Sequence, residues 1–214
     1  MPWVRTGINR LIPTVIWQPV KQVKLSLQRM APDGLILDLG AGGRKIARHV
    51  IGVDFIPFKN TDVVANAHVL PFLDNSADGI FCTGVLEHLE SPQRVLEEIR
   101  RVLKPSGIVH IEVPFIQPYH TDPYDYWRWT LQGLRLFAQA QGFTEISSGA
   151  HLGPTSAMNG LVIAYFKSWF DSRYARKLIE VIFSFFLFPF KFFDRWLINK
   201  TPLMSSGVFF VGKK

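Results

Sequence analysis

A glycine-rich turn directly after an apolar run is the first feature of the sequence that could bind a ligand. The run Leu35–Leu39 contains one carboxylate, Asp38, and ends at the turn Gly40–Gly42. Glycines at such a bend let the backbone approach a ligand, because a Cβ would collide with it or forbid a positive φ. A dinucleotide fingerprint requires glycine at position 45, where this chain has Lys45. The turn therefore predicts a cofactor site, but not one for a nicotinamide or flavin dinucleotide.

A second group of side chains with chemical potential follows the apolar run 108–113. The segment after this run concentrates a histidine, carboxylates, an arginine and large aromatic rings. His120 is the first candidate for a general base, because imidazole titrates near neutral pH. Asp122 and Asp125 are candidates to orient His120 or to replace it, and His88 is a second candidate base. The alternative is a rigid, proline-pinned loop whose polar groups only satisfy one another.

The elements that must position these residues are short apolar runs that alternate with segments of helical periodicity. This alternation is typical of a parallel sheet covered by helices. A helix is predicted to begin at Ser91–Pro92, and a second one, capped by Thr130, to cover 129–141. The predicted strands cover 35–39, 50–53, 62–65, 79–83, 108–113, 144–148 and 207–212. Ligands of an open α/β sheet bind beyond the carboxyl ends of its strands, so we expect the glycine turn and His120 at one edge.

Four motifs in succession resemble those of class I S-adenosylmethionine-dependent methyltransferases, in the type 11-like small-molecule subgroup. Asp38, Gly40 and Gly42 are similar to its DxGxG motif, and the resemblance covers roughly residues 33–115. It implies an α/β fold: a Rossmann-like, doubly wound, mostly parallel sheet with a carboxyl-terminal antiparallel strand. It also implies S-adenosyl-L-methionine as the cofactor, held by Asp38, Gly40, Ala41, Gly42, Asp54, Phe55, Asn66, Ala67 and Thr83. The family commonly has Asp at position 66, and Asn66 could still accept a hydrogen bond from the adenine amine, without charge assistance.

The segment from Val113 to Thr130 is similar to a narrower subgroup of small methyltransferases associated with glycan and lipid-linked metabolism. The resemblance implies methyl transfer to a small-molecule, glycan or lipid-linked acceptor, and we expect a hydroxyl. Two alternatives remain open: C-methylation of a membrane quinone or lipid, and a non-catalytic methyltransferase-like binding module. Arg44 in the glycine turn and Asn66 favour the module. Enzymes that methylate bases usually carry an Asn/Asp-Pro-Pro-aromatic turn where this chain has Cys82–Val85.

The net charge of +7 is unevenly distributed along the chain. Residues 1–30 carry five Lys/Arg and no acid, and residues 151–214 carry nine basic and three acidic residues, whereas the middle of the chain is acidic overall. A nucleic-acid enzyme would more often surround its cleft with positive charge, while basic flanks rich in Phe and Trp favour an anionic membrane surface. We therefore expect no nucleic-acid partner and a peripheral contact with a membrane.

The predicted domains are a basic amphipathic segment at 1–32 and a methyltransferase domain at 33–214, with an apolar helical insertion at about 155–203. The stretch Val181–Phe190 is almost wholly apolar, but crossing a bilayer as a helix takes about 20 residues. It is either a buried helix pair, a patch lying in the membrane interface, or a protein interface.

Cys82 is the only cysteine, so we expect no disulfide and no metal site. Prolines interrupt the apolar amino terminus and no small-residue cleavage pattern follows, which argues against a signal peptide. We expect a cytoplasmic protein at the inner face of the membrane.

Overall fold

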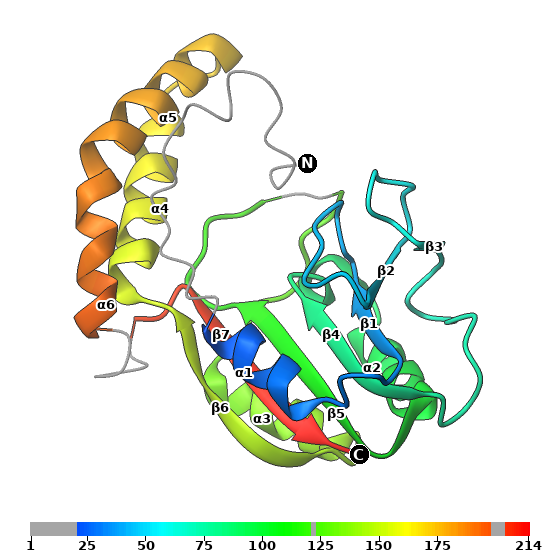
Figure 1. The fold of residues 1–214 in the computed structure, drawn as a ribbon. Coiled ribbons are helices and arrows are strands. Elements are labelled where there is room, and N and C mark those ends of the chain that lie inside the picture. Colours follow the sequence, from blue (N-terminus) through cyan, green and yellow to red (C-terminus); the bar gives the residue numbers. More distant parts are fainter. Residues whose placement is uncertain (1–20, 121–122, 198–203) are drawn as a thin grey trace.

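The computed structural model describes residues 21–120, 123–197 and 204–214. Its centre is a seven-stranded sheet with the strand order β3-β2-β1-β4-β5-β7-β6 (Figure 1). The strands from β1 to β5 pair in parallel, whereas β7 is antiparallel to both β5 and β6. This confirms the predicted mostly parallel sheet with an antiparallel carboxyl-terminal strand. The strands are β1 (Ile36–Leu39), β2 (Val50–Asp54), β3 (Val63–Val64), β4 (Ala77–Thr83), β5 (Leu103–Pro114), β6 (Thr144–Leu152) and β7 (Gly207–Lys213).

Every strand differs in length from the prediction, and β5 and β6 differ most. β3 has two residues where four were expected. β5 begins at Leu103 rather than at 108, because Leu103 already pairs with Ala77 before a register shift. β6 continues to Leu152 because β7 pairs with it along almost its whole length. These differences arise from pairing with neighbouring strands, which the apolar runs alone do not report.

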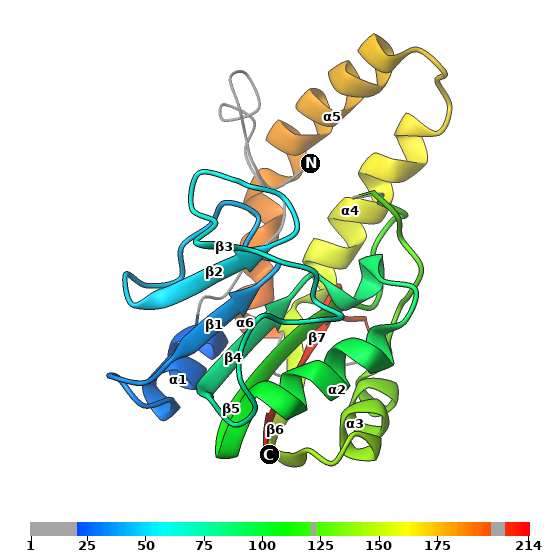
Figure 2. The same ribbon diagram turned by 90° about the vertical axis from the view of Figure 1, so that its right-hand side faces the viewer.

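Helices cover both faces of the sheet. α2 (Pro92–Val102) and α3 (Leu131–Ala140) lie on one face, and α1 (Lys21–Arg29) lies on the other (Figures 1 and 2). The buried side of α2 has the predicted helical spacing, and Thr130 caps α3 by accepting a hydrogen bond from Gly133 N at 3.1 Å. No helix joins β1 to β2: residues 40–49 form turns, so the end of β1 leads into an open loop.

A buried polar network fixes α1 to the sheet. Ser26 Oγ lies 2.7 Å from His110 Nδ1, and His110 Nε2 lies 3.0 Å from Glu112 Oε1. Burial alone would raise the pKa of Glu112, but the neighbouring His151 and His110 outweigh it and lower the pKa to about 2. Glu112 is therefore an anionic partner held between two histidines on β5 and β6.

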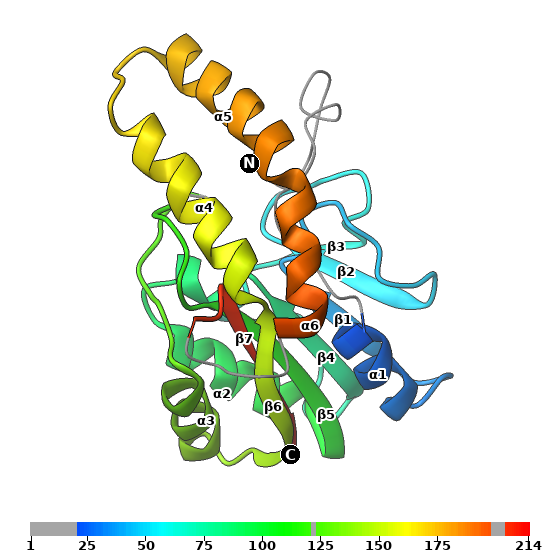
Figure 3. The ribbon, with the colours of Figure 1, turned by 90° about the vertical axis from the view of Figure 1, so that its left-hand side faces the viewer.

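The insertion between β6 and β7 is helical and apolar, as predicted. It forms a helical arm of α4 (Pro154–Lys167), α5 (Arg173–Leu187), the 3-10 segment η3 (Phe188–Phe193) and α6 (Asp194–Leu197). α4 and α5 run side by side and extend past the edge of the sheet (Figures 1 and 3). Asp194 anchors the base of the arm by accepting hydrogen bonds from Thr155 N at 2.7 Å and Ser156 N at 2.8 Å. None of the helices described is long and apolar enough to span a bilayer.

Candidate functional site

The turn after β1 has the open backbone that the glycines predict. Gly40 and Gly42 have φ values of 65° and 56°, and Gly40 N donates to the Val53 carbonyl at 2.8 Å. A Cβ on Gly40 would collide with the side chain of Val85. A Cβ on Gly42 would meet only one atom within 4 Å, the Gly40 carbonyl oxygen at 3.8 Å. One glycine thus permits tight packing, and the other leaves open space at the end of the strand.

Asp54, the last residue of β2, faces this turn. Its Oδ2 accepts a hydrogen bond from Gly42 N at 2.7 Å, and its Oδ1 accepts one from Ile56 N at 2.9 Å. The two backbone donors fix the orientation of the carboxylate, and each oxygen keeps a further lone pair for another donor. Phe55, next in the chain, exposes 75% of its side chain. The structure therefore places a carboxylate and a bare aromatic ring beside the glycine turn.

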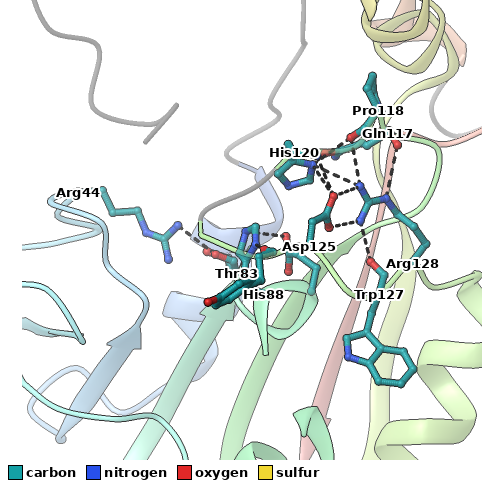
Figure 4. A network of polar contacts seen from close by, with 11 residues as sticks. Arg44, Thr83, His88, Gln117, Pro118, His120, Asp125, Trp127 and Arg128 are labelled. Carbon is teal, nitrogen blue, oxygen red and sulfur yellow. Dashed lines mark hydrogen bonds and ion pairs between the residues drawn. The ribbon is translucent and has the colours of Figure 1, made fainter. Parts of the chain in front are cut away.

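Arg44 lies across the end of β1, paired with Asp38. Its Nε and Nη2 donate to the two oxygens of Asp38 at 2.9 and 2.6 Å. Its Nη1 donates to the Thr83 carbonyl at 3.3 Å (Figure 4). Asp38 is only 2% exposed. Burial lowers the pKa of Arg44, but the bond to Asp38 outweighs it and raises the pKa. The sequence marked Arg44 as unusual for the turn without predicting that it neutralises Asp38.

The remaining predicted cofactor residues follow β3. Ala65 N donates to the Asp54 carbonyl at 3.0 Å, which brings the start of this segment beside Asp54. The side-chain oxygen of Asn66 accepts from His68 N at 2.9 Å and lies 3.0 Å from His68 Nδ1. The side-chain oxygen of Asn66 is therefore already hydrogen-bonded within its own loop. The sequence did not predict this hydrogen bond. Ala67 is partly buried and packs against the main core.

Glu87, His88 and His120 meet beyond the carboxyl ends of β4 and β5. Glu87 and His88 belong to the 3-10 turn η2 (Leu86–His88), directly after β4. Glu87 is 3% exposed, its Oε2 has no hydrogen-bond partner within the described part of the chain, and burial raises the pKa of its carboxyl to about 7. The rings of His88 and His120 lie edge to face, 5.3 Å apart between centroids. The side-chain donor atoms of all three lie within 4.8 Å of one another.

Asp125 and Arg128 hold the segment that carries His120. Arg128 Nη1 and Nη2 donate to the two oxygens of Asp125 at 2.5 and 2.6 Å, and Asp125 Oδ2 also accepts from His120 N at 2.8 Å (Figure 4). Burial alone would raise the pKa of Asp125, but Arg128 and the His120 N–H lower it. Asp125 thus has the geometry of an orienting residue and not of a base. Asp122, the other predicted carboxylate, lies outside the described residues.

Backbone carbonyls orient both imidazoles. His88 Nδ1 lies 2.6 Å from the Tyr124 carbonyl oxygen, and His120 Nδ1 lies 3.1 Å from that of Pro118. An N–H on Nδ1 of His88 satisfies its carbonyl and assigns the lone pair of that ring to Nε2. Nδ1 of His120 also lies 3.3 Å from Arg128 Nη2, which can only donate, so its Nδ1 faces an acceptor and a donor. The sequence singled out His88, His120 and Asp125 as candidates but not Glu87 and Arg128, which the structure places beside them. Arg128 could have been found as a cation three residues after Asp125, whereas the burial of Glu87 had no local signal.

Comparison with known proteins shows what the chain is similar to. Residues 36–111 match a family model described as a methyltransferase domain. The chain is 32% identical over 111 residues to the demethylmenaquinone methyltransferase of Symbiobacterium thermophilum, an alignment that covers 49% of this chain and 43% of that protein. It is 39% identical over 59 residues to the human thiol S-methyltransferase TMT1B, covering 28% of this chain and 22% of that protein. The chain therefore spans less than half the length of these curated relatives.

Solved structures share the fold at low sequence identity. A phosphoethanolamine N-methyltransferase 2 of Haemonchus contortus, in complex with phosphomonomethylethanolamine and S-adenosylhomocysteine, is 19% identical with a TM-score of 0.57. That alignment covers 90% of this chain and 52% of the other. The 1,6-didemethyltoxoflavin-N1-methyltransferase of Burkholderia thailandensis is 13% identical with a TM-score of 0.55, covering 91% and 78% of the two chains. At these identities the likeness establishes the fold.

Proposed function

We propose that this chain is a class I S-adenosylmethionine-dependent methyltransferase, in line with the methyltransferase-domain match of residues 36–111. It transfers a methyl group from S-adenosylmethionine to a hydroxyl of a small-molecule, glycan or lipid-linked acceptor. One observation carries the proposal. The open glycine turn with Asp54 and the cluster of Glu87, His88 and His120 lie at the same edge of the sheet. The first can hold the methyl donor and the second can accept a proton from the acceptor.

The glycine turn fits the adenosyl part of the cofactor. The space beside Gly42 is open, and Asp54 has lone pairs for the hydroxyls of a ribose. The exposed ring of Phe55 offers an apolar face to an adenine. Arg44, which is paired with Asp38 and keeps 40% of its side chain exposed, offers a cation to the carboxylate of the methionyl end. When bound, the cofactor supplies a methyl group on an activated sulfonium leaving group.

His120 is our first choice for the base that takes the hydroxyl proton. Its Nδ1 lies 3.1 Å from the Pro118 carbonyl oxygen and 3.3 Å from Arg128 Nη2, and in the tautomer with the N–H toward the carbonyl Nε2 is the accepting atom. Asp125 and Arg128 hold its backbone in place, as a base in a methyl transfer requires. The donor atoms of His88 and Glu87 lie within 4.8 Å of that of His120, and burial raises the pKa of Glu87 to about 7. The positioned base favours a hydroxyl acceptor over a carbon acceptor.

The helical arm supports a lipid-linked acceptor. Its helices expose many large apolar side chains, far more than a monomeric surface normally leaves in one patch. Basic residues at the start of α5 flank this surface, which suits a bilayer with anionic head groups. We infer that the arm lies on the inner face of the membrane and that the protein is cytoplasmic. The exposed residues are Met158, Leu161, Tyr165, Trp169, Phe170, Tyr174, Leu178, Ile182, Phe185, Phe186, Phe190, Phe192, Phe193 and Trp196.

C-methylation of a membrane quinone or lipid is the second candidate. The similarity to a protein named demethylmenaquinone methyltransferase favours it, and the helical arm suits it equally. The two candidates differ in the bond formed. Label transferred from methyl-tritiated S-adenosylmethionine to a membrane extract is released by hydriodic acid if it forms an ether, and is retained if it forms a carbon–carbon bond. Label in the water-soluble fraction alone would contradict a lipid-linked acceptor.

Cofactor binding is tested by calorimetric titration with S-adenosylhomocysteine. We expect binding by the wild-type protein and by His49→Ala, which changes an exposed histidine beyond the turn. Gly42→Val fills the open space and Asp54→Ala removes the carboxylate, so both should lose most of the affinity. An absence of binding by the wild-type protein would instead support a non-catalytic module.

Membrane contact is tested by flotation with vesicles of neutral phosphatidylcholine, with and without anionic phosphatidylglycerol. We expect the wild-type protein to float with anionic vesicles, and a variant carrying Phe185→Ser and Phe186→Ser to remain below. Leu136→Ser, which changes an exposed apolar residue on α3, is the matched control. Equal flotation of all three proteins, or flotation of none, would refute the role of the helical arm.

A further inference from the structure

We propose that Glu87, His88 and His120 form a binding site for one divalent transition-metal ion, with Zn²⁺ as the probe. The sequence predicted no metal, because 32 residues separate the two histidines and nothing in their spacing resembles a known metal motif. The site lies on the acceptor side of the proposed methyl-transfer centre. Metal binding itself does not require methyl transfer, so the two proposals can fail separately.

The donor set suits a borderline-soft cation. Two imidazoles and one carboxylate are the protein ligands of many open zinc sites and of facial-triad iron sites. The donor atoms of the three side chains lie within 4.8 Å of one another. Ligands about 2.1 Å from a tetrahedral metal are roughly 3.4 Å apart, so the side chains would have to close by about an ångström or more at the longest separation.

The atoms behind the two histidines are those that orient metal ligands. A histidine ligand usually donates its second ring N–H to a carboxylate or a backbone carbonyl, which fixes the tautomer. Here Nδ1 of His88 faces the Tyr124 carbonyl and Nδ1 of His120 faces the Pro118 carbonyl. The bidentate pair of Asp125 and Arg128 holds the backbone of His120 (Figure 4). Both imidazoles are therefore oriented from behind by the main chain.

Glu87 supplies an independent observation that points to a ligand. It is 97% buried, and its Oε2 has no hydrogen-bond partner in the part of the chain that the structure describes. A buried carboxylate oxygen without a partner is destabilising, and a cation bound between Glu87 and the histidines would provide the partner. Two guanidinium groups lie near the cluster, and each has a carboxylate partner: Arg44 is paired with Asp38, and Arg128, whose Nη2 lies 3.3 Å from His120 Nδ1, is paired with Asp125.

Three protein ligands leave coordination positions for other groups, as in catalytic zinc sites. Vicinal hydroxyls, or a hydroxyl beside a carbonyl, could fill these coordination positions. The bound ion would then position an oxygen-rich acceptor. This part of the inference rests on the proposed methyl-transfer function. It also indicates the chemical class of the acceptor, a sugar or an oxygenated ring.

The test uses the full-length protein, stripped with EDTA and titrated with Zn²⁺ against a chromogenic chelator. We expect one Zn²⁺ per chain, and an affinity at least tenfold lower for Glu87→Gln, His88→Ala and His120→Ala. His49→Ala, which removes an exposed histidine elsewhere, should bind Zn²⁺ as the wild type does. Zero stoichiometry, or a loss of affinity that is the same in all four variants, would overturn the proposal.

Two further measurements keep the result interpretable. The visible spectrum of the Co²⁺-loaded protein should show ligand-field bands of a low-coordinate nitrogen–oxygen site, and these bands should be absent in the three cluster variants. Titration with S-adenosylhomocysteine checks that each variant retains the folded cofactor site. Retained binding with lost metal supports the metal site. Metal binding by a protein that cannot bind S-adenosylhomocysteine would refute the proposed cofactor but leave the metal site intact.

Discussion

Replacing Glu87 by Gln in the metal-free protein should stabilise the fold, and only at neutral and alkaline pH. Glu87 is almost wholly buried and Oε2 lacks a hydrogen-bond partner among the described residues. Burial raises the pKa of its carboxyl from 4.5 to about 7, so ionising this group works against the folded state. Glutamine has nearly the same shape and no charge. The substitution therefore removes the energetic penalty of a buried charge without opening a cavity.

The magnitude follows from the linkage between pKa and stability. Because the pKa of Glu87 is higher in the folded state, its contribution to stability is fully present below pH 4.5 and declines as pH rises toward 7. The full decline is about 3 kcal/mol at pH 8, from about 1.4 kcal/mol for each pH unit between the two pKa values. The stability difference between Glu87→Gln and wild type should then grow by about that amount between pH 4.5 and pH 8.

Urea denaturation in the presence of EDTA, repeated across this pH range, measures the difference. Glu97→Gln is the matched control, because it changes an exposed carboxyl on α2 and reports any general effect of the amide. A difference for Glu87→Gln that stays constant with pH, or that favours the wild type at pH 8, would refute the account of Glu87 as a buried, uncompensated acid. Adding saturating Zn²⁺ should reverse the sign at pH 8, since the wild type then gains a bound ion.

Three other substitutions test the elements around the site. Glu112→Gln should lower the free energy of unfolding at neutral pH by up to about 3 kcal/mol. The stability difference from wild type should fade as pH drops from 4.5 toward 2, where wild-type Glu112 becomes protonated, and urea titration at several pH values measures it. Gly40→Ala should cost about 1–3 kcal/mol in thermal unfolding, because its φ is positive and the new methyl meets Val85; an unchanged melting temperature would contradict the packing described. Arg44→Ala should cost about 1–3 kcal/mol by leaving buried Asp38 without its cation, and the double variant with Asp38→Asn should recover part of the loss in a double-mutant cycle.

The sequence was sufficient for the order of elements in the sheet and for the proximity of the glycine turn to Asp54. Buried strands of a parallel sheet are continuous apolar runs, and helices repeat their apolar residues every three to four positions, so both can be identified locally. The glycine turn and Asp54 follow strands directly. Since carboxyl ends of parallel strands meet at one edge, their proximity could be predicted without coordinates.

The acceptor side needed the tertiary structure. His88 and His120 follow different strands, and their contact depends on how the segment after β5 folds back over η2. Nothing near Glu87 in the sequence indicates that its carboxyl is buried, because burial depends on segments that come from elsewhere in the chain. The same holds for Arg44, whose pairing with Asp38 depends on the path of an irregular loop.

For the helical arm, too, the sequence predicted the elements but not which of their side chains are buried. Its apolar composition was evident in the sequence, which left open whether those residues form a core, a membrane patch or a protein interface. Helical periodicity shows that side chains share a face but not what covers that face. Local rules of chain geometry thus determined which elements form and where a cofactor can approach. The tertiary structure alone decided which polar groups are buried together and which apolar groups stay exposed, because burial is a property of contacts between distant parts of the chain.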